Sequence, residues 1–297
     1  MSTPSVVLIT GITARGLGAS LAIQLAKTPT QYKVYGTLRS LAKAEEFYKE
    51  AREKGVEGTS VGILELDVTD AGSCKKAVQE LVDKEGRIDV LVNNAGAGFV
   101  QTIESASEEQ IQNCFDVNFF SAYRMCRLTI PHMRAQNSGR IINISSIGGL
   151  VGQPFNETYC AAKCALDSLA ESFNGTLWKW NIHVSSFCPG AITSAFAGTA
   201  MKTLAGQDVG DAYKPVLDEY VKNLTARYSL PEAANSRQTP EECAADVVAI
   251  IEAERPKVRY ATHTVKELVD KKFVEDGGDK IVGFLRNRYF PADFPSA

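Results

Sequence analysis

The chain has 297 residues, a formal net charge of −3 at pH 7, 44% apolar residues and 23% charged residues. This balance gives no reason to expect nucleic acid or an anionic membrane surface as a partner, and no apolar run approaches the ~18 residues that span a bilayer. Seven cysteines without a C-x-x-C pair argue against a disulfide framework and a metal site, and with the start Met-Ser-Thr-Pro-Ser they predict a cytoplasmic protein.

Apolar runs of strand length recur along the chain, with stretches of helical character between them. The predicted strands are 6–10, 33–38, 61–66, 88–93, 140–145, 183–188 and, as a last candidate, 257–262. The predicted helices are 17–27, 42–54, 71–84, 107–135 and 159–177. Nearly continuous apolar strands alternating with helices are typical of a parallel sheet covered on both faces. The pattern therefore predicts a single doubly wound, Rossmann-type α/β domain with seven strands.

A glycine-rich turn follows the first predicted strand and leads into the helix 17–27. Glycines at such a turn let the backbone approach a pyrophosphate, which the free N–H groups of the helix N-terminus stabilise. The alternative is a glycine-rich turn without a ligand, and the position between strand and helix favours the functional interpretation. The predicted cofactor-binding residues of this turn are Thr10, Gly11, Arg15, Gly16, Leu17 and Gly18.

The end of the second strand indicates which dinucleotide is bound. A carboxylate there would bind the ribose 2′-hydroxyl of NAD, whereas a cation accommodates the 2′-phosphate of NADP. This chain has Leu38 followed by Arg39, and Arg15 in the glycine turn is a second possible cation. These residues predict a preference for NADPH and NADP+. The alternative is that both arginines are solvated surface residues.

The third and fourth strands also end in residues suited to a nucleotide, at the edge where open α/β sheets bind ligands. Asp67 could accept a hydrogen bond from an adenine amino group, or it could cap the helix 71–84, a role that Asp70 fits better. The remaining predicted cofactor contacts at these strand ends are Val68, Asn94, Ala95 and Gly96.

Tyr159 and Lys163 lie four residues apart, so a helix places both side chains on one face. A fixed ammonium stabilises a phenolate and is expected to lower the pKa of Tyr159 from ~10 towards neutrality, which suits proton transfer. The spacing Tyr-x-x-x-Lys is weak evidence alone. It gains force from Ser146 at the end of the fifth strand and from Asn118 in the helix 107–135.

Taken in order, the glycine turn, Asn93-Asn94-Ala95-Gly96, Asn118, Ser146, Tyr159-x-x-x-Lys163 and Pro189-Gly190 resemble the short-chain dehydrogenase/reductase family from residue 5 to about 196. The sequence between Ile147 and Lys163 is similar to the branch of that family that contains 17β-hydroxysteroid dehydrogenase type 1 and photoreceptor retinol dehydrogenase. One departure is the glycine turn, which has four residues between Gly11 and Gly16 where the family pattern has three.

The resemblance implies hydride transfer between the nicotinamide of NADP(H) and a small-molecule ketone, aldehyde or alcohol. It implies Tyr159 as general acid in reduction and general base in oxidation, Ser146 as a hydrogen-bond donor to the substrate oxygen, Lys163 as the holder of the nicotinamide ribose and Asn118 as the anchor of a proton-relaying water. The segment expected to fix the nicotinamide ring contains Pro189, Gly190, Ile192 and Ser194.

The same resemblance assigns substrate contacts to Ile147, Gly148, Val151, Gln153, Asn156, Ala191 and Phe196. Most of these are apolar, as expected for an apolar substrate, and steroids and retinoids are alternative classes. Core packing is the alternative role for Val151 and Phe196. A catalytically silent NADPH-binding regulatory protein is an alternative function, and an epimerase or dehydratase of the wider superfamily is disfavoured by the short C-terminal part.

The chain is thus predicted to be one domain, 1–297, with a dinucleotide-binding and catalytic core at 5–194. The segment 195–237 has no strand pattern and is expected to form a substrate lid or loop. A C-terminal helix, strand and tail are expected at 238–297. Family members commonly pair through the helices that hold Asn118 and Tyr159, so the resemblance implies a homodimer or homotetramer.

Overall fold

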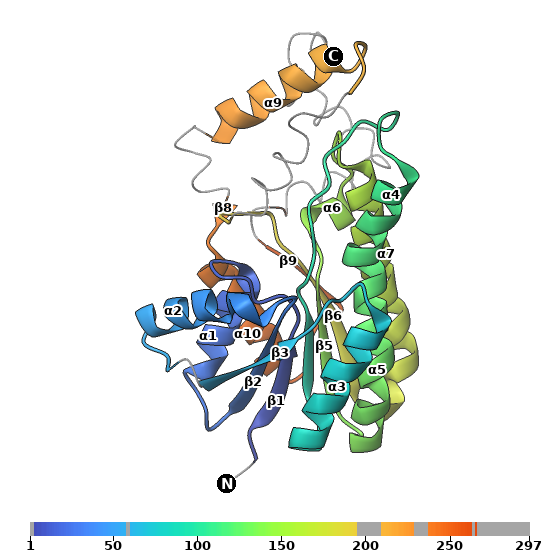
Figure 1. Ribbon diagram of the computed structural model, residues 1–297. Helices are drawn as coiled ribbons and strands as arrows, with labels where there is room; N and C mark the ends of the chain where they lie inside the picture. Colours follow the sequence, from blue (N-terminus) through green and yellow to red (C-terminus); the bar gives the residue numbers. More distant parts are fainter. Residues whose placement is uncertain (1–2, 58–59, 195–208, 229–236, 263–264, 266–297) are drawn as a thin grey trace.

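The computed structural model describes residues 3–57, 60–194, 209–228, 237–262 and Val265. Seven parallel strands form one sheet in the order β3-β2-β1-β4-β5-β6-β9 (Figure 1). They are β1 (Ser5–Ile9), β2 (Tyr32–Leu38), β3 (Val61–Glu65), β4 (Val90–Asn93), β5 (Gly139–Ile144), β6 (Ile182–Cys188) and β9 (Arg259–Ala261). The prediction of a seven-stranded, doubly wound α/β sheet is confirmed.

Helices cover both faces of the sheet (Figure 1). One face carries α1 (Leu17–Ala26), α2 (Ala44–Glu53) and α10 (Pro240–Glu252), and the other carries α3 (Ala71–Glu85), α5 (Ser121–Gln136) and α7 (Glu157–Leu177). Strand β1 shows why both faces are covered. Its residues Val7 and Ile9 pack in the first core cluster and Val6 and Leu8 in the second, because successive side chains of a strand point to opposite faces.

The helix predicted at 107–135 is interrupted near its middle. Ser107 starts α4 (Glu108–Phe115) with a capping box that it shares with Gln110. A π-helical turn, Asp116–Phe120, then joins α4 to α5. Turns of this kind recur at functional sites, and this one holds Asn118.

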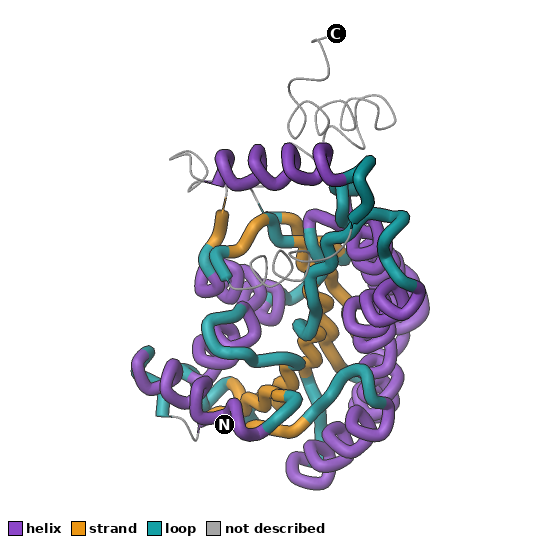
Figure 2. Tube along the Cα trace, turned by 45° about the horizontal axis from the view of Figure 1, so that its top comes forward, coloured by secondary structure: helices purple, strands orange, loops and turns teal. Residues whose placement is uncertain are grey.

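The strand order reverses between β2 and β4, which flank β1, so a crevice is expected outside the carboxyl ends of β1 and β4. Around this edge lie the short helix α6 (Ile147–Leu150) and a two-stranded sheet of β7 (Ala191–Ile192) and β8 (Arg237–Gln238). Helix α9 (Lys214–Tyr228) crosses above the edge (Figures 1 and 2). The rest of the predicted lid, residues 195–208 and 229–236, lies outside the described residues, as does most of 263–297.

A third core cluster joins α9 to the carboxyl edge. Leu217 and Tyr220 of α9 pack with Val100, Leu150 and Phe155, and the rings of Phe155 and Tyr220 lie 5.1 Å apart, edge to face. The described part of the predicted lid is therefore fixed over the sheet by apolar contacts.

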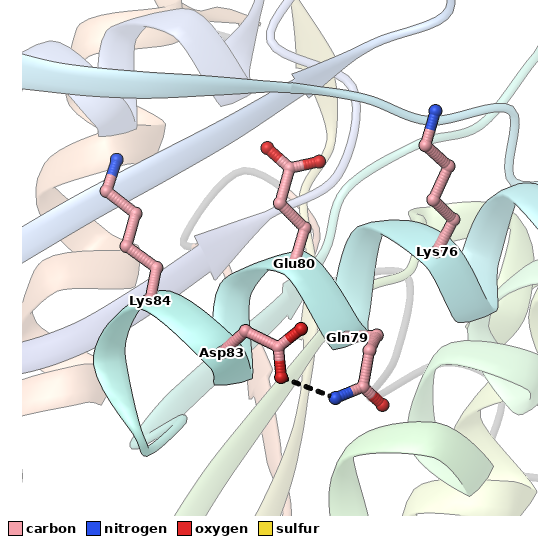
Figure 3. A pocket seen from close by; sticks show the side chains of 5 residues that line it. All are labelled: Lys76, Gln79, Glu80, Asp83 and Lys84. Carbon is pink, nitrogen blue, oxygen red and sulfur yellow. Dashed lines mark hydrogen bonds between the residues drawn. The ribbon is translucent and has the colours of Figure 1, made fainter.

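The outer face of α3 is a solvated surface rather than a site. A hollow of about 490 Å³ lies on it, lined by Lys76, Gln79, Glu80, Asp83 and Lys84, all from this one helix (Figure 3). Gln79 donates a hydrogen bond to Asp83 at 2.7 Å, as residues four apart on a helix surface commonly do. Among the described helices, none combines the length and apolar character that crossing a lipid bilayer requires.

Candidate active site

The glycine turn presents the uncapped N-terminus of a helix to the carboxyl edge of the sheet. Helix α1 begins at Leu17 with Gly16 as its N-cap, no side chain caps it, and no acidic residue lies in its first turn. The free N–H groups of that first turn can therefore bind an anion. Gly18 allows the turn to pack closely, because a Cβ atom there would lie 2.4 Å from Asn94 Nδ2 and 2.6 Å from the Gly11 carbonyl oxygen.

Thr10 and Asn94 are both predicted to bind the cofactor, but in the structure their side chains form hydrogen bonds with the backbone around the turn. The Thr10 hydroxyl accepts hydrogen bonds from the backbone N–H groups of Asn94 and Ala95, each at 3.0 Å. The Asn94 amide donates to the carbonyl oxygens of Thr10 (2.9 Å) and Gly11 (2.7 Å). The structure therefore places these two side chains as supports of the turn, which leaves its backbone to face a ligand.

Arg15, the extra residue of the turn, adopts a left-handed conformation with φ of 61° and is exposed. Its backbone N–H donates to the Glu50 carboxylate of α2 at 2.6 Å, and Glu50 also pairs with Lys54 at 2.7 Å. Arg15, Glu50 and Lys54 line a hollow of about 290 Å³ that also includes Thr193 and Glu241. The sequence analysis did not identify Glu50 as a partner of the glycine turn. An acidic residue in an amphipathic helix is normally solvated, and nothing in the local sequence indicates that this one is buried.

Arg39 and Asp67 lie at the carboxyl ends of β2 and β3. Arg39 is exposed, and its charge helps to lower the pKa of Asp67, although the larger cause is hydrogen bonding from Thr69. The backbone N–H and the hydroxyl of Thr69 both donate to Asp67 Oδ1, at 2.9 and 2.7 Å. Asp70, not Asp67, caps α3, as the sequence favours. In the described part of the chain no contact joins Arg15 to Arg39, and Val68 is buried in the second core cluster.

The structure brings the four predicted catalytic residues to one place. Tyr159 and Lys163 share a face of α7, with Lys163 Nζ 5.7 Å from the centre of the Tyr159 ring. The Ser146 hydroxyl caps α6 by accepting from Gly148 N–H at 3.0 Å and also hydrogen-bonds with Tyr159. A Cβ atom on Gly96 would lie 3.0 Å from Asn118 Oδ1 and 3.4 Å from Lys163 Nζ, so this glycine gives both side chains room.

Asn118 is almost fully buried and ties the π-helical turn to the loop after β4. Its Nδ2 donates to the carbonyl oxygens of Ala97 (2.9 Å) and Cys114 (3.0 Å), and its Oδ1 accepts from Ala97 N–H at 3.2 Å. The side chain is thus fully engaged in holding the loop. The bond to Cys114 matches the alternative considered from the sequence, a backbone hydrogen bond within the helix, while the anchoring of a proton-relaying water stays a prediction.

The expectation that Lys163 lowers the pKa of Tyr159 is wrong for this structure. Burial raises the pKa of Tyr159 above its ordinary value, and the hydrogen bond with Ser146 opposes that rise only in part. Burial also lowers the pKa of Lys163 to about 8, while its Nζ donates to the Ile144 carbonyl oxygen at 2.9 Å. Desolvation outweighs attraction because both groups are removed from water. At neutral pH the phenol is protonated and the amine still carries its charge.

The segment predicted to fix a nicotinamide is pinned beside α6. The Pro189 carbonyl oxygen accepts from Ile147 N–H at 2.8 Å, and Gly190 N–H donates to the Thr262 hydroxyl at 3.2 Å. Ile192 lies in β7, and Ser194 N–H donates to the Ile192 carbonyl oxygen at 2.8 Å. These contacts bring the segment close to Ser146, the residue before Ile147.

The predicted substrate residues divide into two groups. Gly148 lies against the phenol, because a Cβ atom there would be 3.3 Å from Tyr159 Cε1. Partly exposed positions at the same edge are Ile147, Gln153, Asn156 and Ala191. Val151 is only 2% exposed and packs in the third core cluster, which matches the core-packing role considered for it from the sequence. Phe196 lies outside the described residues.

Comparison with known sequences gives matches over most of the chain. Residues 5–205 match the model of the family described as short chain dehydrogenase. The chain is 36% identical to human 17-beta-hydroxysteroid dehydrogenase type 1, over 98% of this chain and 88% of that protein. It is 34% identical to human retinol dehydrogenase 8, over 95% of this chain and 89% of that protein.

Solved structures with the same fold include a short-chain dehydrogenase from Streptomyces avermitilis, with a TM-score of 0.70 and 25% identity over 96% of this chain and 92% of that one. A second is an actinorhodin polyketide ketoreductase crystallised with NADPH, with a TM-score of 0.72 and 23% identity over 89% of this chain and 98% of that one. The second likeness concerns the fold alone.

Proposed function

The chain belongs to the short-chain dehydrogenase/reductase family of oxidoreductases, and from that membership we propose that it reduces an apolar ketone or aldehyde with NADPH. The observation that carries the proposal is the cluster at the carboxyl edge of the sheet. There Tyr159 has a raised pKa, Ser146 lies within hydrogen-bonding distance of it, and Lys163 lies behind it with a charge. The phenol is protonated at neutral pH and so has a proton to give, although its raised pKa makes it a weaker acid than a group that titrates near pH 7.

The residues present fit a dinucleotide. The uncapped start of α1 offers N–H groups to a pyrophosphate. Gly18 and Gly96 have no Cβ atom, which leaves room for the close approach of Asn94 to Gly18 and of Asn118 to Gly96. Arg39, exposed directly after β2, would face a 2′-phosphate where an NAD-binding site has a carboxylate. When bound, NADPH supplies the hydride.

In this proposal the chain's own residues handle the proton and the developing charge. Ser146 donates a hydrogen bond to the substrate oxygen while Tyr159 gives that oxygen its proton. In the reverse direction Tyr159 accepts the proton from the alcohol. Lys163 holds the ribose hydroxyls. Asn118 fixes the position of the loop after β4 relative to Lys163 through its hydrogen bonds with the backbone of Ala97.

A bulky apolar substrate is supported by two observations. The relatives named above are a hydroxysteroid dehydrogenase and a retinol dehydrogenase, and the substrates in their names are large apolar alcohols. In this chain Gly148 leaves space beside the phenol, and Ile147 packs on the apolar third core cluster beneath α9. We propose that α9 and the adjoining parts of 195–237 form the substrate lid.

A carbonyl panel tests the function directly. Wild-type protein is mixed with NADPH, or with NADH, and with apolar ketones and aldehydes that include steroids and retinal, and nucleotide oxidation is followed by absorbance. We expect turnover with NADPH that exceeds turnover with NADH. Tight NADPH binding without turnover on any carbonyl would instead favour a regulatory NADPH-binding protein.

We further propose that the protein forms a homodimer, or a homotetramer built from such dimers, through an aromatic surface on the π-helical turn, α5 and α7. Phe120 and Tyr123 are 47% and 44% exposed, which is high for large apolar side chains. Phe119 joins them, at 5.1 Å from Phe120 and 6.4 Å from Tyr123 between ring centres, and Phe173 of α7 lies 6.4 Å from Tyr123. Aromatic residues grouped in this way commonly anchor interfaces.

The change Phe120→Gln with Tyr123→Gln is expected to weaken self-association by roughly 10-fold or more, because it removes two aromatic anchors. Sedimentation equilibrium over a range of protein concentrations measures the dissociation constant. Trp178→Gln is the matched control, since this side chain is 68% exposed at the end of α7 but outside the aromatic surface. An unchanged dissociation constant in the double variant would place the interface elsewhere.

A further inference from the structure

Asp167 is a buried acid that the proposed mechanism does not use. It lies one helical turn after Lys163 on α7 and is 2% exposed, while Lys163 is 4% exposed. Among the Asp, Glu, Lys and Arg side chains of the described residues, Glu50 is the third that is buried, and it pairs with Lys54 on the opposite face of the sheet. Lys163 and Asp167 are therefore a basic and an acidic side chain buried in the same region.

The carboxylate of Asp167 lies where α7 meets the ends of β5 and β6. The Cys188 thiol donates to both carboxylate oxygens, at 3.7 and 3.8 Å. The hydroxyl groups of Ser145 and Ser186 favour the charged form of Asp167, although burial raises its pKa overall. Cys188 precedes Pro189 and Ser145 precedes Ser146, so this one side chain borders both segments that line the active site.

Gly149 in α6 is needed for this arrangement. A Cβ atom on Gly149 would lie 2.4 Å from Asp167 Oδ2 and 2.8 Å from Ser145 Oγ, closer than real Cβ contacts. The helix that Ser146 caps is therefore packed directly on the carboxylate. A change in the size or charge of Asp167 is transmitted to Ser146 by contact.

The charge of Asp167 also acts on Lys163. The Lys163 ammonium donates to the Ile144 carbonyl oxygen and not to the carboxylate, so the two charges interact through space in a region without solvent. Asp167 is the largest influence that raises the pKa of Lys163 against burial. Without this charge the lysine would lose its proton at lower pH.

We propose that Asp167 is a positioning residue of the active site: its buried carboxylate keeps the Lys163 ammonium charged and holds the segment that presents Ser146. This inference rests on the function proposed above for Lys163 and Ser146.

Other titratable groups face this pair and are weaker candidates. The thiols of Cys114 and Cys188 approach Lys163, and the pKa of each thiol is raised by burial, so both are neutral near pH 7. Tyr159 is neutral for the same reason. Arg259 of β9 acts on Asp167, but it pairs with the exposed Glu171 and is itself partly solvated.

The test is Asp167→Asn in the full chain, which keeps the shape of the side chain and removes its charge. We expect the alkaline midpoint of the pH profile of kcat/KM to move to lower pH by roughly one unit, since a buried opposite charge is lost. At acidic pH, where Lys163 is protonated in both proteins, the two activities should converge. Asp83→Asn on the solvated face of α3 removes the same charge and should leave the midpoint unmoved. An unmoved midpoint in Asp167→Asn would overturn the proposal.

A second readout does not depend on turnover. NMR titration of protein labelled with carbon-13 at lysine Cε, with the resonance assigned through Lys163→Arg, gives the pKa of Lys163 in wild type and in Asp167→Asn. A lower pKa in the variant supports the proposal, and an equal pKa overturns it, even if no carbonyl substrate is turned over. If the variant does not fold, the ionisation state of Asp167 in the wild-type protein is measured instead, from the NMR chemical shift of its carboxyl carbon. An ionised carboxylate at pH 7 supports the proposal, and a protonated one overturns it.

Discussion

Tyr159→Phe is expected to lower kcat for carbonyl reduction by ~10²–10⁴-fold, the usual contribution of a positioned general acid. The substitution removes only the hydroxyl. The phenyl ring can still pack against Gly148 and lie over the Lys163 ammonium, as the tyrosine ring does at 5.7 Å. NADPH affinity should therefore stay close to the wild-type value. Steady-state kinetics and equilibrium titration of NADPH fluorescence measure the two quantities separately.

Tyr32→Phe is the matched control for this experiment. Its hydroxyl donates to Glu252 at 3.1 Å, and its pKa is raised to about 12 by burial and by that carboxylate, yet it starts β2 at the opposite end of the sheet. Its kcat should be unchanged. Turnover of Tyr159→Phe within the range of Tyr32→Phe would remove Tyr159 from the chemistry.

The second large effect concerns the choice of dinucleotide. The double change Arg15→Ser with Arg39→Asp is expected to lower the ratio of kcat/KM for NADPH over NADH by roughly 100-fold or more, since each lost charge-assisted hydrogen bond is worth about 1.5–3 kcal/mol. A carboxylate at residue 39 would repel the 2′-phosphate and accept from the 2′-hydroxyl of NADH.

The single variants assign the effect to each arginine. Arg39 is expected to contribute more, because it follows β2 directly, whereas the backbone of Arg15 is bonded to Glu50 and its side chain lines a separate hollow. Arg52→Ser on α2, an exposed arginine paired with Glu45, is the control for the loss of a surface cation. A double variant that keeps the wild-type ratio of kcat/KM for NADPH over NADH would show that neither arginine binds the 2′-phosphate.

Most of the sheet could be predicted because strands of a buried parallel sheet appear in the sequence as short continuous runs of apolar residues. The strand predicted at 61–66 forms as Val61–Glu65 and that at 183–188 as Ile182–Cys188. The strand predicted at 88–93 starts two residues later, at Val90, since the backbone of Ile88 pairs with the Gln136 side chain instead. Such a contact joins residues 48 apart and leaves no local pattern.

The interrupted helix shows the same limit. Apolar periodicity predicts one helix through 107–135, but Asn118 reaches across to Ala97 at both of its polar atoms and a π-helical turn forms at this point. Family resemblance predicts Asn118 as an active-site residue, and its side chain lies near Lys163, on the other side of Gly96. The change of helix geometry around it depends on a loop 21 residues away, so local sequence could not predict it.

The proximity of the candidate site residues could be predicted from the sequence, but their pKa values could not. Tyr159, Ser146 and Lys163 come together as their spacing and order indicate. The direction of the Tyr159 pKa was not predictable, because it depends on how far burial removes water from the phenol. Asp167 gave no signal either, since an acid four residues after a lysine on a helix is usually a solvated pair.

The short pairing of β7 with β8 joins the two ends of the stretch that leaves the sheet after Cys188. Ala191 and Ile192 lie beside Arg237 and Gln238, and Thr193 is bonded to Gln238 by both its N–H and its hydroxyl. Backbone pairing thus holds the two ends of this stretch together, in addition to the apolar contacts that α9 makes with the carboxyl edge. We therefore expect sequence changes between this pair of strands to leave the position of β6, and of the Pro189–Gly190 segment that follows it, unaltered.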